Sequence, residues 1–218
     1  MDKVIQLAGQ LWLPALIAAV SAYLLGCFNG AVIVSKYILR DDVRNHGSGN
    51  AGLTNFHRTF GGGLTAVVIL CDVLKAVAAL LVAELVLGLF PVAGVSVSHA
   101  RYFAGVFCLL GHSFPCMFQF KGGKGILSGG AIAIMVDWRV ALVVWGGWLL
   151  LVILTRYISL GSVYTGVAFP IASWFVFRDW AVLVMAILLG GLIVVRHGGN
   201  IKRLLAGNER KFSFHKKK

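Results

Sequence analysis

Long runs of apolar residues, separated by short polar segments rich in glycine, extend along this chain from Leu11 to Val195. A membrane hydrocarbon core about 30 Å thick requires around 20 helical residues to cross it. The pattern therefore predicts seven spans, at residues 11–39, 63–90, 98–118, 126–136, 139–155, 162–177 and 181–195. The fourth would reach only about 17 Å at 1.5 Å per residue, so we expect it to begin inside the preceding glycine-rich segment or to be re-entrant.

The composition supports this assignment. The chain is 59% hydrophobic and only 13% charged, whereas about a quarter of the residues in soluble domains are charged. No separate soluble domain fits between the apolar runs, so we expect one all-α domain over residues 1–218, a polytopic seven-transmembrane-helix bundle. The first twenty residues lack a small-residue cleavage site, which indicates a retained first helix.

The net charge of +12 does not indicate nucleic-acid binding, because the basic residues are divided among loops between apolar runs. Anionic lipid or a phosphate-bearing ligand suits this distribution better. Nothing in the sequence indicates a required protein partner. The four cysteines have no Cys-x-x-Cys spacing, so we expect buried thiols and neither a metal site nor a disulfide framework.

The basic residues also predict an orientation. Seven crossings would place four segments on one side of the membrane, namely loops 40–61, 119–125 and 156–161 and the tail from Arg196. These segments and their flanks hold 15 of the 20 lysines and arginines, including Lys216, Lys217 and Lys218 at the end of the tail. By the positive-inside rule this side is cytoplasmic, with the N-terminus outside and the C-terminus inside.

Four polar patches fall on this predicted cytoplasmic face. They are "GSGNAGLTNFHR" at 47–58, "GHSFPCMFQFKGGKG" at 111–125, "TRYISLGS" at 155–162 and "RHGGNIKRLLAGNE" at 196–209. Glycine lets a ligand approach backbone amides closely, and amides beside lysine or arginine form an anion-binding nest. The first two patches fit this pattern, so we expect a phosphate site. The alternative interpretation is flexible turns whose lysines set the topology.

Other kinds of site are disfavoured by what the sequence lacks. Lys124 is followed by Gly125, not by the serine or threonine of a P-loop, which argues against nucleoside triphosphate hydrolysis. Only eight acidic residues are present, with no cluster suited to magnesium. We therefore expect neither a metal nor another cofactor.

Several single residues carry open alternatives. Asp72 and Lys75 lie three residues apart in the second span, where a structural ion pair is the favoured interpretation and a functional role the alternative. We expect His112 to hold the adjacent loop through a hydrogen bond. His197 could contact a ligand or simply lie at the membrane interface. Ser159 and Ser162 could contact a ligand or cap a helix.

Together the four patches resemble those of the bacterial acyl-phosphate:glycerol-3-phosphate acyltransferases, the PlsY family. Asp42 and Arg44, followed by the run from Gly47 to Arg58, match the first family motif, and residues 111–125 match the second completely. Residues 156–162 and 196–209 match the third and fourth. Visible departures are Leu53, where a smaller residue is usual, and the basic tail "HKKK" at the C-terminus.

The resemblance implies a multi-pass enzyme of the bacterial inner membrane, with its active site facing the cytoplasm. It would transfer an acyl group from acyl phosphate to the 1-hydroxyl of glycerol 3-phosphate, giving lysophosphatidic acid and phosphate for phospholipid synthesis without a protein nucleophile. The implied catalytic residues are Asn50, Thr54, Asn55 and Lys124. The implied substrate-binding residues are Ser48, Gly49, Arg58, Lys121, Gly122, Gly123, Ser159, Ser162, His197 and Asn200.

Two other classes of protein are alternatives to an enzyme. A transporter for an organic phosphate would also need a basic, glycine-rich site, but transporters usually place it between two related halves, and no repeat is visible here. A non-catalytic membrane scaffold would not need the motif side chains for lipid synthesis.

Overall fold

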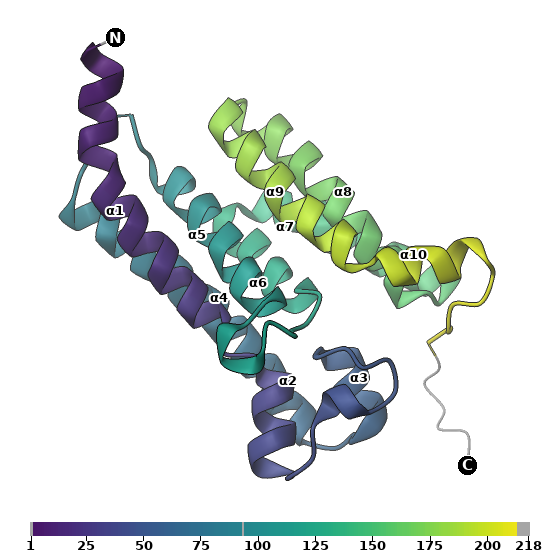
Figure 1. Cartoon of the computed structure of the whole chain (residues 1–218). Coiled ribbons are helices and arrows are strands. Elements are labelled where there is room, and N and C mark those ends of the chain that lie inside the picture. Colours follow the sequence, from purple (N-terminus) through teal and green to yellow (C-terminus); the bar gives the residue numbers. More distant parts are fainter. Residues whose placement is uncertain (1, 93, 213–218) are drawn as a thin grey trace. The chain divides into compact units, whose positions relative to one another are not determined.

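The computed structural model describes residues 2–92 and 94–212 of the chain (Figure 1). Within these ranges the chain forms helices and connecting segments, with no strand. The all-α prediction is therefore confirmed for the described residues. The chain divides into two compact units, residues 1–136 and 137–218, and each is described by itself below.

Four helices form the body of the first unit: α1 (Asp2–Gly26), α4 (Leu64–Leu89), α5 (Val97–Ser113) and α6 (Ile126–Val136). Helix α1 packs against α4 and α5, and α6 packs against the same two helices (Figure 1). Glycines allow α1 and α5 to approach closely. A methyl group added to Gly26 would overlap the carbonyl oxygen of Cys108, and one added to Gly111 would overlap that of Tyr23.

The segment between α1 and α4 carries short helical elements. They are α2 (Gly30–Ile33), the π-helical turn η1 (Val34–Ile38), the 3-10 turn η2 (Val43–Asn45) and α3 (Leu53–Thr59). The predicted first span, which ran to Leu39, was therefore wrong at its end. Helix α1 ends at Gly26, and a new helix begins after Asn29, whose side chain accepts a hydrogen bond from the amide of Val32.

Helix α3 lies in the stretch from residue 40 to 61 that was predicted to be a loop. Phe56 is fully buried and forms a small core with Ala31, Val34, Val43 and Val68. Thr54 and Arg58, four residues apart, are exposed. The first polar patch therefore has a helical second half with one buried and one exposed face.

The 3-10 turn η3 (Cys116–Phe118) separates α5 from α6. Helix α5 ends at Ser113, five residues before the predicted boundary, because Pro115 disfavours helical continuation of the residue before it. The cysteine prediction was wrong for Cys116, which is exposed, and for Cys71, which is only partly buried. Cys27 and Cys108 are buried as expected.

The second unit contains α7 (Trp138–Thr155), α8 (Ile158–Phe177), α9 (Trp180–Arg196) and α10 (Gly198–Leu205). Helix α8 packs against both α7 and α9, and α10 contacts α8 and α9. Helix α8 begins four residues before the predicted span, so Ser159 lies in its first turn. Helix α10 lies in a segment for which no helix was predicted.

By length and composition, four described helical segments could cross a membrane: Gly9–Gly26, Leu64–Leu89, Trp138–Thr155 and Ile158–Phe177. Helices α9 and α10, bent by 58° at His197, would add a fifth if they formed one span. The boundaries of α4, α6, α7 and α9 agree with four predicted spans to within one residue. The predicted cytoplasmic charges Lys216, Lys217 and Lys218 lie outside the described residues, as does the rest of the "HKKK" tail.

Candidate active site

The first glycine-rich loop is held by one buried amide, that of Asn55. Its Oδ1 accepts a hydrogen bond from the amide of Ser48 at 3.1 Å, and its Nδ2 donates to the carbonyls of Val43 and His46, each at 3.0 Å. Gly47 turns the chain with a φ of 56°, which glycine adopts without strain. The carbonyls of Val43 and His46 also accept backbone amides, so the side chain of Asn55 adds hydrogen bonds that join the two ends of this loop to α3.

Four side chains of the first patch remain available to a ligand. Ser48, Thr54 and Arg58 are exposed and Asn50 is partly buried. None of the four makes a side-chain hydrogen bond to any residue in the part of the chain that the structure describes. Two hydroxyls, one amide and one guanidinium can together bind an oxyanion, with Arg58 supplying the charge.

The second glycine-rich loop lies on the end of α5. The amide of Gly122 donates to the carbonyl of Ser113 at 3.2 Å, and that of Gly123 donates to the carbonyl of His112 at 3.1 Å. No side chain fits at Gly122, where a methyl group would overlap the carbonyl oxygen of His112. Helix α1 contributes as well, because the hydroxyl of Tyr23 donates to the carbonyl of Phe114 at 2.8 Å.

The two loops meet at Gly123. A methyl group added there would lie 2.5 Å from the carbonyl oxygen of Ala51 in the first loop and would overlap Nε2 of His112. The same carbonyl accepts a hydrogen bond from Nδ2 of the fully buried Asn29 at 3.0 Å. Two segments about 70 residues apart in sequence are therefore in direct contact.

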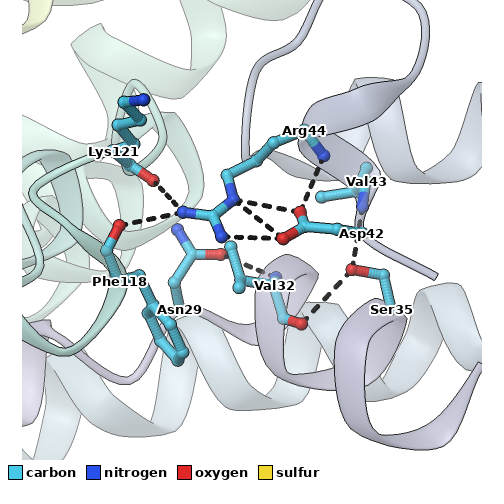
Figure 2. A network of polar contacts seen from close by, with 8 residues as sticks. All are labelled: Asn29, Val32, Ser35, Asp42, Val43, Arg44, Phe118 and Lys121. Carbon is cyan, nitrogen blue, oxygen red and sulfur yellow. Dashed lines mark hydrogen bonds and ion pairs between the residues drawn. The ribbon is translucent and has the colours of Figure 1, made fainter. Parts of the chain in front are cut away.

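Arg44 joins the two loops a second time (Figure 2). Its Nε and Nη2 donate to the two carboxylate oxygens of Asp42 at 3.0 and 2.7 Å. Its Nη1 donates to the carbonyls of Phe118 at 2.9 Å and Lys121 at 3.3 Å. The planar guanidinium can hold all these acceptors at once, which the single ammonium of a lysine cannot.

The ion pair between Arg44 and Asp42 is insensitive to pH near neutrality. Hydrogen bonds from Arg44 hold the pKa of Asp42 below its ordinary value, although partial burial opposes this shift. A lowered pKa in the folded state means that the pair stabilises the protein above the ordinary pKa of an aspartate, about 4. This contribution is lost only as the pH falls below that value.

The second unit holds the other predicted site residues. Ser159, Ser162, His197 and Asn200 are all buried. Ser162 donates to the carbonyl of Ile158 at 2.9 Å within α8. The hydroxyl of Ser159 is buried and interacts with the carboxylate of Glu209, whose pKa it helps to lower.

Hydrogen bonds also fix the side chains of His197 and Asn200 in the second unit. Nδ1 of His197 lies 2.8 Å from the carbonyl of Ile193, and it therefore carries the ring proton. Nδ2 of Asn200 donates to Glu209 at 2.8 Å, and Arg203 donates to the other oxygen of Glu209 at 2.7 Å. Burial alone would raise the pKa of Glu209, but the hydrogen bonds from Asn200, Arg203 and Ser159 lower it.

Within each unit, then, predicted site residues lie together. The first unit joins the loop of Ser48 and Gly49 to the loop of Lys121, Gly122 and Gly123, and the second collects its four on α8, the α9–α10 bend and α10. That all four patches form one site stays a prediction. The sequence reasoning missed Asn29, although an asparagine amid apolar residues is itself a signal, because polar groups are costly in a membrane.

Residues 16–207 match the family model described as glycerol-3-phosphate acyltransferase. The chain belongs to this acyltransferase family. A curated glycerol-3-phosphate acyltransferase of Thermoanaerobacter pseudethanolicus is 36% identical over 197 residues, covering 90% of this chain and 95% of that protein. One of Pseudomonas putida is 37% identical over 202 residues, covering 92% and 99% respectively.

A solved structure of the family has a similar fold. It is a crystal structure of PlsY (YgiH), an integral membrane glycerol 3-phosphate acyltransferase, in its glycerol 3-phosphate form. Its TM-score is 0.80 at 35% sequence identity, covering 91% of this chain and 96% of the other. Together with the apolar helices, this similarity identifies the chain as a multi-pass integral membrane acyltransferase, as the sequence motifs implied. The family prediction is confirmed.

Proposed function

We propose that this protein transfers a fatty acyl group from acyl phosphate to the 1-hydroxyl of glycerol 3-phosphate. The hydroxyl oxygen forms a new ester bond with the acyl carbon, and the carbon–oxygen bond to phosphate breaks. The products are lysophosphatidic acid and inorganic phosphate, which leaves with the hydroxyl proton. A PlsY structure in a lysophosphatidic acid form supports this choice of product.

The observation that carries the proposal is the junction of the two glycine-rich loops at Ala51 and Gly123. The junction brings the backbones of two distant motifs into contact, and the first motif also carries the ligand-accessible side chains of Ser48 and Asn50. Lys121 and Lys124 lie in the second loop, and Arg58 lies on α3 directly after the first. Amide donors beside cations favour phosphate groups, and both substrates carry one.

A protein nucleophile is unnecessary for this reaction. Acyl phosphate is a mixed anhydride and is already activated toward a hydroxyl. Alignment of the two substrates can lower the barrier by about 7–11 kcal/mol, and one donor aimed at the developing oxyanion by about 2.7–4 kcal/mol. The departing phosphate can accept the hydroxyl proton, so no separate protein base is required.

The roles of individual residues follow from this mechanism. In the proposal, Ser48, Arg58, Lys124, Ser162, His197 and Asn200 hold the two phosphate groups, with help from Gly49, Lys121, Gly122, Gly123 and Ser159. Asn50 and Thr54 orient the glycerol or the acyl carbonyl. Asn55 was predicted to share that task, but its three hydrogen bonds to the loop favour a positioning role.

The chemistry also suggests a location. Glycerol 3-phosphate is water-soluble and acyl phosphate partitions into lipid, so a site at the membrane interface suits both substrates. In the proposal this site lies on the cytoplasmic side of a bacterial inner membrane, which the chain crosses seven times. Accessible-thiol labelling of single cysteines at Ser48 and Lys202, both exposed, in a cysteine-free background, tests this arrangement. We expect both to react from the cytoplasmic side. Labelling from opposite sides would exclude a shared site.

The donor is tested with purified protein in lipid bilayers. Labelled glycerol 3-phosphate is supplied with an acyl phosphate, an acyl-carrier-protein thioester or a coenzyme A thioester. We expect labelled lysophosphatidic acid from acyl phosphate alone. Equal product from a thioester would contradict the proposed donor, and uptake of glycerol 3-phosphate into vesicles without conversion would instead favour a transporter.

A further inference from the structure

Three ionisable side chains are buried together in the first unit. Asp72 and Lys75 lie on α4 and His112 lies on α5, and each is at most 5% exposed. Nζ of Lys75 lies 2.8 Å from Oδ1 of Asp72 and 2.7 Å from Nδ1 of His112. The ion pair expected between Asp72 and Lys75 is confirmed, but its contact with His112 was not foreseen.

The hydrogen-bonding chemistry of this group determines the tautomer of His112. A lysine ammonium has donors only. Nδ1 of His112 must therefore accept from Lys75, and the proton of the neutral ring is on Nε2. Asp72 in turn holds Lys75 in place and accepts from the amide of Gly30 at 3.3 Å.

The protonated edge of His112 faces the place where the two glycine-rich loops meet. A methyl group on Gly123 would overlap Nε2 and would lie 3.0 Å from Cε1 of the same ring. The backbone carbonyl of His112 also accepts the amide of Gly123. His112 thus contacts both the buried ion pair and Gly123.

We propose that Asp72 and Lys75 act through His112 as positioning residues for the acyltransferase. They fix the imidazole with its Nε2 proton toward the junction of the loops, and the ring sets the position of Gly123 and hence of Lys124. None of the three is a catalytic residue in this scheme. The proposal rests on the proposed function for placing substrate at the junction, but its structural part stands apart from the reaction.

A purely structural role for the Asp72–Lys75 ion pair predicts a different result. A double variant without either charge distinguishes the structural role from the positioning role. Replacing both partners in Asp72→Leu/Lys75→Met removes the buried charges together, which is often neutral or stabilising when the pair serves only the fold. Positioning would still be lost, because Met cannot donate to His112. The matched control is Glu84→Gln/Arg101→Gln, which neutralises a second ion pair (2.6 Å) between α4 and α5.

Hydrogen exchange and histidine NMR provide readouts that do not depend on activity. We expect Asp72→Leu/Lys75→Met to speed amide exchange at Gly122, Gly123 and Lys124, while the control double variant leaves it unchanged. In protein labelled with ¹⁵N-histidine, the His112 signal, assigned by its loss in His112→Gln, should show the Nε2-protonated tautomer. In the variant it should shift toward a mixture of tautomers.

The kinetic expectation is a fall in kcat/KM for glycerol 3-phosphate of about a hundredfold, the scale of a 1 Å misplacement of a reacting group. Unchanged exchange and an unchanged tautomer in the charge-free variant would overturn the proposal. If the parent protein does not use acyl phosphate, the proposed function fails by itself, and the exchange and NMR data still decide the role of Lys75. If this double variant does not fold, Asp72→Ala/Lys75→Met, which also leaves no buried charge unpaired, is measured by the same two methods.

Discussion

Replacing Gly123 by alanine is expected to lower kcat/KM for glycerol 3-phosphate by about a hundredfold or more. The added methyl group would overlap Nε2 of His112 and lie 2.5 Å from the carbonyl oxygen of Ala51. Neither neighbour can move easily, because Lys75 holds the imidazole and Asn29 holds the carbonyl. The loops must therefore separate, and a displacement near 1 Å costs about a hundredfold in rate.

The matched control for this change is Gly88→Ala. Gly88 lies on α4 in the same unit, and a methyl group there would meet no atom within 4 Å. Alanine also favours a helix over glycine by about 1 kcal/mol, so the control should be as active and as stable as the parent. Initial rates at varied glycerol 3-phosphate, with thermal unfolding followed by tryptophan fluorescence, distinguish the two. Parental kinetics in a folded G123A variant would show that the loops do not meet as described.

Hydropathy alone was sufficient for four of the helices. The apolar runs located α4, α6, α7 and α9 to within one residue, because a membrane helix needs a continuous apolar surface. The same criterion failed between residues 27 and 39, which are apolar but do not continue α1. There Asn29 caps a new helix, and a hydropathy average does not register a single capping residue.

The chemistry of the candidate site was harder to predict than its location. Glycine and lysine content singled out both of the loops that meet at Gly123, since these residue types suit phosphate directly. The role of Asn55 could not be seen, because its partners are backbone carbonyls of Val43 and His46, set by the path of the loop. Contacts between distant segments, such as Lys75 with His112, likewise depend on helix packing that no local pattern encodes.

Replacing Asn55 by aspartate is expected to destabilise the first unit by about 1–3 kcal/mol. The two side chains have nearly the same shape, but aspartate loses both donors to the carbonyls of Val43 and His46 and presents a charged oxygen to them. Each carbonyl keeps a backbone donor, the amide of His46 for Val43 and that of Gly49 for His46, so each lost hydrogen bond costs about 0.5–1.5 kcal/mol. The loop carrying Ser48 should then lose its fixed conformation, and kcat/KM should fall with stability.

The deficit should grow with pH, because burial against two carbonyls disfavours the carboxylate and raises the pKa of the new side chain. Protonated aspartate can still donate one hydrogen bond, so the variant should be more stable at pH 5 than at pH 8. Asn45→Asp is the matched control, since Asn45 is exposed two residues from Val43 and gains the same charge. Equal thermal unfolding of N55D and N45D, with only the activity of N55D reduced, would instead assign Asn55 to direct substrate contact.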